Sequence, residues 1–301
     1  MSLPHFPFPE LWMFKALFIS MRPQQWVKNL VLFAGLVFSF NLFQLDLFLQ
    51  VLIAFFLFCF LTSGVYLLND ILDLNSDKAH PLKSKRPIAS GKLKPSTALF
   101  FSLLFIAIAL AFSFYLNWIF GLVALSYLVL NLIYSRYLKH IVILDVMAIS
   151  LGFVLRAVAG AVIIDVEISS WLIVCTTLLA LFLGFGKRRY ELVLLEDKAV
   201  EHRKSLAEYT PYFLDQLISV VTASTVVAYA FYTLSPEVED KLGTTHMALT
   251  IPFVLYGVFR YLYLIHQKEK GGSPTTALLT DKPLIFDILL WFFSVILIVY
   301  L

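Results

Sequence analysis

The chain has 301 residues, of which 60% are hydrophobic, 16% are aromatic and only 14% are charged, and its mean hydropathy is +0.85. Soluble domains are about 45–50% apolar and about 25% charged, and a compact soluble fold cannot hide this much apolar surface. These values exclude a soluble enzyme, a disordered chain and a disulfide scaffold, and a net charge of +3 is too small to indicate a nucleic-acid partner.

Nine apolar stretches are long enough to cross a bilayer, which takes about 20 mostly apolar residues in a helix. The sequence therefore predicts an all-α, polytopic membrane bundle of about nine transmembrane helices, forming a single domain over residues 1–301. The predicted spans are 26–44, 47–69, 96–116, 118–134, 141–164, 169–187, 212–234, 246–266 and 284–301.

The distribution of basic residues indicates the orientation of this bundle. Nine spans place the N-terminus and the long polar connections 70–95, 188–211 and 267–283 on one side of the membrane. All of the 23 Lys and Arg residues except Arg156 and Lys241 lie on that side or at its helix ends. Basic residues mark the cytoplasmic side, so we expect a plasma-membrane protein with cytoplasmic catalytic loops near residues 70–95 and 188–211.

Polar residues accompany the start of the first predicted span. Arg22, Gln25 and Asn29 share one helical face, and Lys28 lies close by. Two interpretations remain open for this segment. It is either an interfacial anchor with Trp26 among the lipid headgroups, or a polar face that lines the same cavity as the loops.

Three carboxylates follow the second predicted span. Asp70, Asp73 and Asp77 are three and four residues apart, so on a helix they share one face. Hard oxygen ligands at this spacing suit Mg²⁺, which prefers a few carboxylates together with substrate phosphates. Asn69 can add an amide oxygen, and these four residues are the predicted metal ligands. The alternative is a solvated acidic helix end at the membrane surface.

Basic residues come directly after the carboxylates. Lys83 and Arg86 lie in a proline-punctuated loop between Pro81 and Pro87. A metal site beside fixed cations is what a diphosphate needs, because Mg²⁺ binds some of its oxygens and Lys or Arg binds the others.

The fifth predicted span contains Arg156 near its middle, where a charge is costly and usually functional. Asp145 lies on nearly the same face, three turns earlier, which is too far for direct contact. Each is therefore expected to meet a partner from another helix or a ligand, with a structural buried ion pair as the alternative. Lys139, in the short turn before this span, could line the same cavity.

A second polar segment begins where the sixth predicted span ends. It reads GKRRYELVLLEDKAVEHRKS from Gly186. Lys187 and Glu191 are spaced for a surface salt bridge. The functional alternative is a second phosphate or metal half-site that faces the first loop from the same side of the membrane.

These motifs, in this order, resemble the UbiA superfamily of intramembrane prenyltransferases over essentially the whole chain. The family motif NxxxDxxxD corresponds to Asn69, Asp73 and Asp77, with Asp70 as an extra carboxylate. Aromatic-prenyltransferase members carry a second acidic pair after the sixth span, whereas this chain has the mostly basic GKRRYE. The stretches SMRPQQWVKN, HPLKSKRPIASG and RKSLAEYT are more similar to the decaprenyl-phosphate phosphoribosyltransferase branch.

The resemblance implies a Mg²⁺-dependent enzyme that transfers 5-phosphoribose from phosphoribosyl diphosphate to a polyprenyl (decaprenyl-like) phosphate and releases diphosphate. Asp70, Asp73 and Asp77 would be the catalytic metal ligands, and Lys83 and Arg86 would neutralise the leaving diphosphate. The other implied substrate-binding residues, which would serve the sugar phosphate or the lipid phosphate, are Lys28, Asn29, Asn69, Lys139, Arg156, Lys187, Arg188, Tyr190, Glu191, Arg203 and Lys204.

Two other functions stand beside this one. An ordinary UbiA prenyltransferase would use a prenyl diphosphate donor and an aromatic or other acceptor, but that function calls for an acidic pair after the sixth span. A transporter would show internal repeats or helices broken at mid-membrane, and the sequence has no convincing repeat. Membrane lipids are expected partners, nucleic acid is not, and the sequence is compatible with a homo-oligomer.

Overall fold

The computed structural model describes the whole chain except residues 1–8, 80–82, 196–203, 268–273 and 301. The described residues form helices and no strands, which confirms the all-α prediction. Eight helical segments in this part of the chain are long and apolar enough to cross a membrane. They match the second to ninth predicted spans and are formed by α3 (Leu45–Leu72), α5 (Pro95–Leu116), α6 (Trp118–Arg136), α7 (Leu144–Ile163), α8 (Ser170–Leu195), α11 (Pro211–Thr233), α13 (Ile251–Gln267) and α15 (Lys282–Tyr300).

The first predicted span is not one continuous α-helix. Helix α1 (Pro9–Met21) ends at Arg22, whose φ of 55° lies in the left-handed region, and Pro23 follows. The chain continues as the 3₁₀ helix η1 (Pro23–Leu32) and the short α2 (Phe33–Phe38). With rises of about 2.0 and 1.5 Å per residue, η1 and α2 together have a contour of about 30 Å. This contour only just equals the thickness of the hydrocarbon core, and the segment is not among the described helices that are long and apolar enough to cross a membrane.

The remaining described helices are short and connect the long ones. They are α4 (Leu74–Ala79), η2 (Lys83–Lys85), η3 (Leu138–His140), α10 (Lys204–Ala207), α12 (Pro236–Leu242), η5 (His246–Thr250) and α14 (Pro274–Thr280). The chain divides into two compact units. The first unit comprises residues 1–29 and 53–132, and the second comprises residues 30–52 and 133–301.

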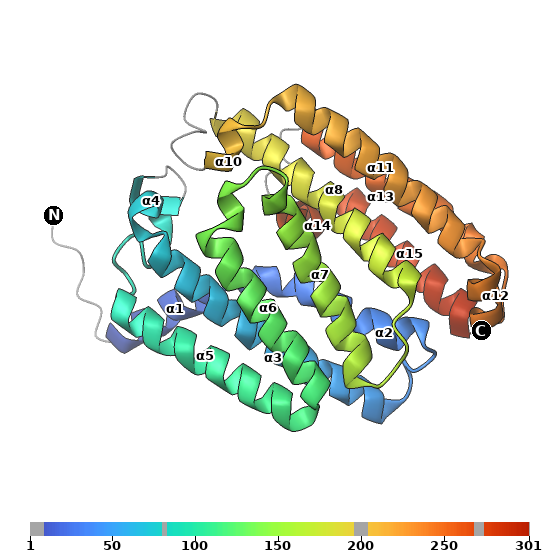
Figure 1. The fold of residues 1–301 in the computed structure, drawn as a ribbon, viewed down its shortest axis with the longest axis horizontal. Helices are drawn as coiled ribbons and strands as arrows, with labels where there is room; N and C mark the ends of the chain where they lie inside the picture. The colour runs from blue at the N-terminus through green and yellow to red at the C-terminus, as the bar shows by residue number, and fades with distance from the viewer. Residues whose placement is uncertain (1–8, 80–82, 196–203, 268–273, 301) are drawn as a thin grey trace. The chain divides into compact units, whose positions relative to one another are not determined.

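The first unit packs around the aromatic ring of Phe58 on α3. Its ring centroid lies 5.8 Å from that of Phe120 and 5.5 Å from that of Tyr127, both on α6. The hydroxyl of Ser102 on α5 donates to the carbonyl of Gly64 at 2.7 Å. Helices α3, α5 and α6 therefore form one close-packed group (Figure 1).

A second apolar cluster in the first unit fixes the loop after the predicted carboxylates. Ile88 and Leu93 of this loop are buried with Leu17 of α1 and Leu67 of α3. Burying these side chains removes their apolar surface from water. The same packing fixes the backbone next to Arg86.

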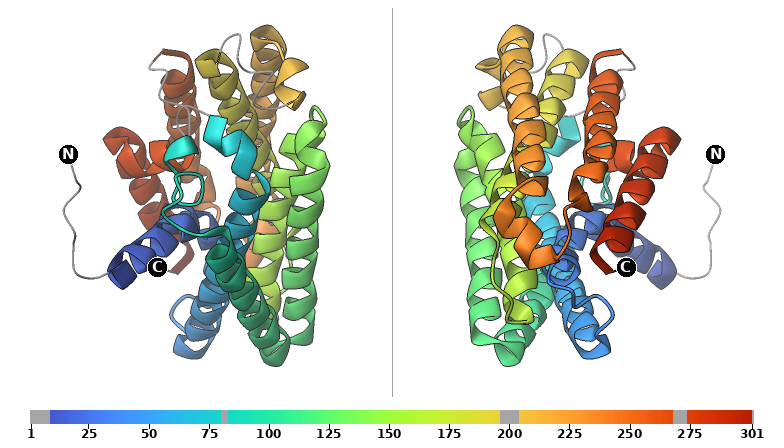
Figure 2. Two further views of the ribbon diagram at one scale, coloured as in Figure 1. Left: turned by 90° about the vertical axis from the view of Figure 1, so that its left-hand side faces the viewer. Right: turned by 90° about the vertical axis from the view of Figure 1, so that its right-hand side faces the viewer.

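The second unit is centred on α8, which lies between α7 and α11 (Figure 1; Figure 2 gives two side views). The hydroxyl of Ser150 on α7 donates to the carbonyl of Thr177 on α8 at 2.9 Å. On another face of α8, the ring of Phe182 packs edge-on against Tyr261 of α13 with centroids 5.3 Å apart. Helix α8 thus packs against α7, α11 and α13.

Gly160 on α7 permits a very close backbone approach within the second unit. A Cβ at this position would lie 1.9 Å from the carbonyl oxygen of Leu32. Gly160→Ala is therefore expected to lower the free energy of unfolding by about 3 kcal/mol or more, because η1 and α7 must separate. At Gly35 an added Cβ would lie 3.1 Å from the Cα of Ala161, so Gly35→Ala is expected to lower the free energy of unfolding by less than Gly160→Ala does. Denaturation in detergent micelles measures both variants, and equal stabilities would contradict this close approach.

Candidate functional site

The predicted carboxylates lie where α3 ends and α4 begins. The backbone N–H of Asp73 donates to the carbonyl of Asn69 at 2.9 Å, and that of Asp77 donates to Asp73 at 2.8 Å. These bonds continue the helical register across the junction and place Asn69, Asp73 and Asp77 at successive four-residue steps. Asp70 and Asp77 are almost fully buried, whereas Asp73 is half-buried.

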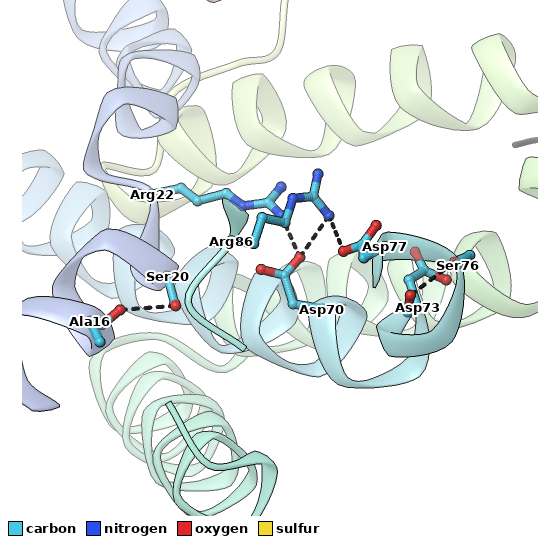
Figure 3. Close-up of polar contacts among 8 residues, drawn as sticks. All are labelled: Ala16, Ser20, Arg22, Asp70, Asp73, Ser76, Asp77 and Arg86. Carbon is cyan, nitrogen blue, oxygen red and sulfur yellow. Dashed lines mark hydrogen bonds and ion pairs between the residues drawn. The ribbon is translucent and has the colours of Figure 1, made fainter. Parts of the chain in front are cut away.

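Two arginines converge on the buried carboxylates (Figure 3). Arg22 forms an ion pair with Oδ1 of Asp70. Nη1 of Arg86 lies 3.1 Å from that same oxygen and 2.6 Å from Oδ2 of Asp77. We call these four residues the arginine–carboxylate network. Its hydrogen bonds are charge-assisted and neutralise two buried carboxylates.

The three aspartates are not arranged as a metal site in this structure. Among the described residues, no three His, Cys, Asp or Glu side chains converge closely enough to hold a metal ion. Figure 3 shows Asp73 set apart from the two guanidinium groups. The donor chemistry nevertheless suits a hard cation, because the arginines engage only one oxygen each of Asp70 and Asp77.

Local structure directs both arginines toward the carboxylates. Arg22 adopts its left-handed φ at the end of α1, and its guanidinium lies 4.9 Å from the centre of the Tyr66 ring. The N–H of Arg86 donates to the carbonyl of Lys83 at 2.9 Å, which closes the η2 turn. Lys83 is half-buried beside Arg86. From the sequence alone, Arg22 belongs either to an interfacial anchor or to a polar face that lines a cavity. Its position directly before Pro23, which favours a helix end there, is the one sequence feature that sets it apart.

The rest of the N-terminal polar segment packs on α3. Nε1 of Trp26 donates to the hydroxyl of Ser63 at 3.1 Å, so this indole N–H faces protein. Asn29 is fully buried, and its amide donates to Sγ of Cys59 at 3.3 Å. Trp26 and Asn29 thus both contact α3, while Lys28 is half-buried.

A second charged cluster lies in the second unit, at the start of α7 and the end of α8. Nε of Arg188 lies 2.7 Å from Oδ2 of Asp145, and both side chains are almost completely buried. Arg188 also pairs with Glu191, and Nζ of Lys187 lies 3.7 Å from Glu191. The predicted Lys187–Glu191 pair is confirmed, and Asp145 meets a partner from another helix, as expected.

Tyr209 connects the cluster to the segment that precedes α11. Its hydroxyl donates to Oδ1 of Asp145 at 2.9 Å and accepts from the N–H of Ile143 at 2.7 Å. Burial, and then the charge of Asp145, raise the pKa of this hydroxyl well above its usual value, so it remains a donor. In the same segment Ser205 donates to the carbonyl of Lys139 at 2.9 Å. Sequence reasoning gave neither residue a function, although both belong to the stretch RKSLAEYT.

The other predicted residues occupy separate positions. Nη1 of Arg156 donates to the carbonyl of Gly152 at 3.0 Å, and its guanidinium lies 5.1 Å from the centre of the Phe153 ring. Arg156 is thus buried within α7, among contacts from its own helix. Lys139 and Tyr190 are half-buried. Arg203, and the side chain of Lys204, lie outside the described residues.

Several cations of these two clusters remain partly exposed. Arg22 and Arg86 each expose 28% of their side-chain surface, and Lys187 exposes 40%. Each lies beside a carboxylate that holds it in place. Fixed, partly exposed cations beside buried carboxylates are suited to binding phosphates, with the carboxylates available to a hard metal ion.

Comparison with known proteins gives consistent matches. The model of the UbiA prenyltransferase family matches residues 30–298. The chain is 35% identical to the "Decaprenyl-phosphate phosphoribosyltransferase" of Corynebacterium glutamicum, over 94% of this chain and 86% of that protein. It is 32% identical to the protein of that name from Mycolicibacterium smegmatis, over 90% of this chain and 88% of that protein.

Solved structures agree on the fold. A UbiA homolog from Archaeoglobus fulgidus, solved bound to GPP and Mg²⁺, superposes with a TM-score of 0.71 at 19% identity. The match covers 95% of this chain and 100% of that one. A digeranylgeranylglyceryl phosphate synthase superposes with a TM-score of 0.64 at 19% identity, covering 94% of this chain and 98% of that one.

Proposed function

The chain belongs to the UbiA prenyltransferase family, and within it we propose that the chain transfers 5-phosphoribose from phosphoribosyl diphosphate to a polyprenyl phosphate. The observation that carries this proposal is its identity of 32–35% to two decaprenyl-phosphate phosphoribosyltransferases, over nine-tenths or more of the chain. The basic second motif supports it, because Lys187, Arg188 and Arg189 stand where a second acidic pair would serve an ordinary prenyltransferase.

In this reaction the bond between the anomeric carbon and the diphosphate oxygen breaks. A bond forms from that carbon to a phosphate oxygen of the lipid, and diphosphate leaves. The acceptor is already ionised, so the reaction needs no strong general base. Positive charge develops on the ribose ring and negative charge on the leaving group, so stabilising the diphosphate contributes much of the rate.

The arginine–carboxylate network and its neighbours provide that stabilisation. Arg86 and Lys83 neutralise the leaving diphosphate from the loop after α4. Asp70, Asp73 and Asp77, with Asn69, would hold a Mg²⁺ ion. Bound there, the ion would act as a Lewis acid on the diphosphate oxygens.

Cations of the second unit are our candidates for binding the other phosphates. Lys187 is partly exposed and is held by Glu191, so it is suited to bind the 5-phosphate of the sugar or the phosphate of the lipid. Arg188 and Tyr190 lie on the same helical end, and Arg203 and Lys204 follow in sequence. Lys28, Lys139 and Arg156 are the candidates that guide the lipid phosphate from the membrane.

The chain is an integral membrane protein, and we propose that these polar ends face the cytoplasm. The support is the concentration of Lys and Arg at the same ends of the helices. Phosphoribosyl diphosphate is water-soluble and the acceptor is a lipid, so a site at the membrane surface gives access to both substrates.

One assay tests the proposal directly. Purified protein is incubated with Mg²⁺, phosphoribosyl diphosphate labelled in the ribose, and a polyprenyl phosphate, and lipids are separated by chromatography. We expect a labelled lipid that requires both the metal and the acceptor. Transfer from a prenyl diphosphate, with no labelled lipid from phosphoribosyl diphosphate, would instead support the ordinary prenyltransferase function.

A further inference from the structure

The arginine–carboxylate network is electrically balanced by its own side chains. Arg22 and Arg86 supply two positive charges, and Asp70 and Asp77 supply two negative charges. The carboxylates are almost fully buried, where an uncompensated charge would be costly. The two guanidinium groups therefore supply, beside these carboxylates, the same positive charge that a divalent cation would supply.

This balance opposes the binding of a metal ion on its own. A divalent ion placed at Asp70 and Asp77 would lie beside two guanidinium groups that already satisfy those carboxylates. Each carboxylate keeps one oxygen that the arginines do not engage, but the ion would bind there against the positive charge of Arg22 and Arg86, or would separate them from their charge-assisted partners. The structure thus presents a barrier to metal alone that the spacing of the aspartates does not reveal.

A diphosphate removes this barrier because it offers the arginines new partners. Both side chains keep 28% of their surface exposed, so they lie at the open edge of the network while the carboxylates lie beneath it. Guanidinium groups bind phosphate oxygens in a forked, two-bond geometry. The ring of Tyr66, 4.9 Å from Arg22, also supports that cation when it leaves Asp70.

We propose that Arg22 and Arg86 are exchangeable counter-ions that make metal and diphosphate bind as a coupled pair. When both ligands bind, Arg22 and Arg86 exchange their contacts with the carboxylates for contacts with the diphosphate, and the carboxylates become available to the metal. Each ligand then increases the affinity for the other by the same factor, which we expect to be at least tenfold. Arg22 becomes a diphosphate-binding residue alongside Arg86. This inference rests on the proposed function for the identity of the diphosphate donor. Its test uses inorganic diphosphate and does not depend on that function.

The test measures metal binding without any transfer reaction. Purified protein is titrated with Mn²⁺ as the probe ion, and bound metal is followed by electron paramagnetic resonance, first alone and then with inorganic diphosphate at fixed free Mn²⁺. We expect weak binding of Mn²⁺ alone and at least tenfold tighter binding with diphosphate. Arg86→Gln should bind Mn²⁺ alone more tightly than the unmodified chain, while the effect of diphosphate shrinks.

Lys85→Gln is the matched control, because it removes a neighbouring exposed cation that has no described contact with the carboxylates. It should change the Mn²⁺ affinity little, which separates counter-ion exchange from a general change in charge. Arg22→Gln provides a second test if Arg86→Gln melts at a lower temperature. If neither arginine variant binds Mn²⁺ alone more tightly than Lys85→Gln, the proposal is wrong.

This outcome is independent of the transfer assay. A labelled lipid without coupled binding would retain the proposed function and overturn the counter-ion exchange. Coupled binding without a labelled lipid would retain the exchange and overturn the choice of donor or acceptor.

Discussion

Asp73→Asn is expected to lower transfer by about 10²- to 10³-fold or more, with little change in stability. Each preorganised group that stabilises the developing charge is worth about this much, and this substitution removes a carboxylate that we propose holds Mg²⁺. Asp73 is the best position for the test because it lies outside the arginine–carboxylate network. Substituting Asp70 or Asp77 would also remove a buried partner of Arg22 or Arg86, so lost folding could be mistaken for lost catalysis.

The measurement compares initial rates of lipid labelling with melting curves in the same detergent. Asp46→Asn provides a matched control, because it makes the same substitution in the first turn of α3, at the opposite end from Asp73. We expect the control to retain both activity and melting temperature. An Asp73→Asn enzyme with near-normal rates at saturating Mg²⁺ would remove Asp73 from the metal site.

The helical register of the carboxylates could be predicted because it is a local property, but whether three carboxylates converge in the described part of the chain could not. The register from Asn69 to Asp77 follows from hydrogen bonds between residues four apart, and such bonds are set by the chain itself. The eight regular spans were predictable for a similar reason, since length and hydropathy determine them. The first span was less so, because the stretch 26–44 forms part of a 3₁₀ helix and the short α2, which ends at Phe38, and an apolar window does not distinguish these from one regular helix.

The partners of the buried charges could not be predicted from spacing. Arg22 is 48 residues from Asp70, and no periodic pattern connects them. The sequence indicated that Asp145 needs a partner from another helix, but Arg188 and Tyr209 became identifiable only in the folded chain. Sequence reasoning treated Arg188 as a phosphate ligand because it is basic and lies beside a loop. Its side chain is only 1% exposed, so its first function in this structure is to hold Asp145 and Glu191.

Arg188→Gln is accordingly expected to reduce the free energy of unfolding by about 3–5 kcal/mol, because it leaves the buried carboxylate of Asp145 without its cation. Lys187→Gln is the neighbouring control. Its side chain is 40% exposed and 3.7 Å from Glu191, so its loss should cost less than about 1 kcal/mol. Chemical denaturation in detergent micelles measures both variants, and equal effects would contradict the buried pair.

A double variant separates the structural function of Arg188 from a substrate-binding one. Asp145→Asn combined with Arg188→Gln removes both buried charges, and the amide oxygen of the new asparagine can still accept from the hydroxyl of Tyr209. We expect most of the lost stability to return, since the cost arises from an unpaired charge rather than from lost volume. Lipid labelling by this double variant then reports on Arg188 itself. Activity that returns with stability assigns Arg188 to the buried ion pair, whereas activity that stays low assigns its guanidinium to a substrate phosphate as well.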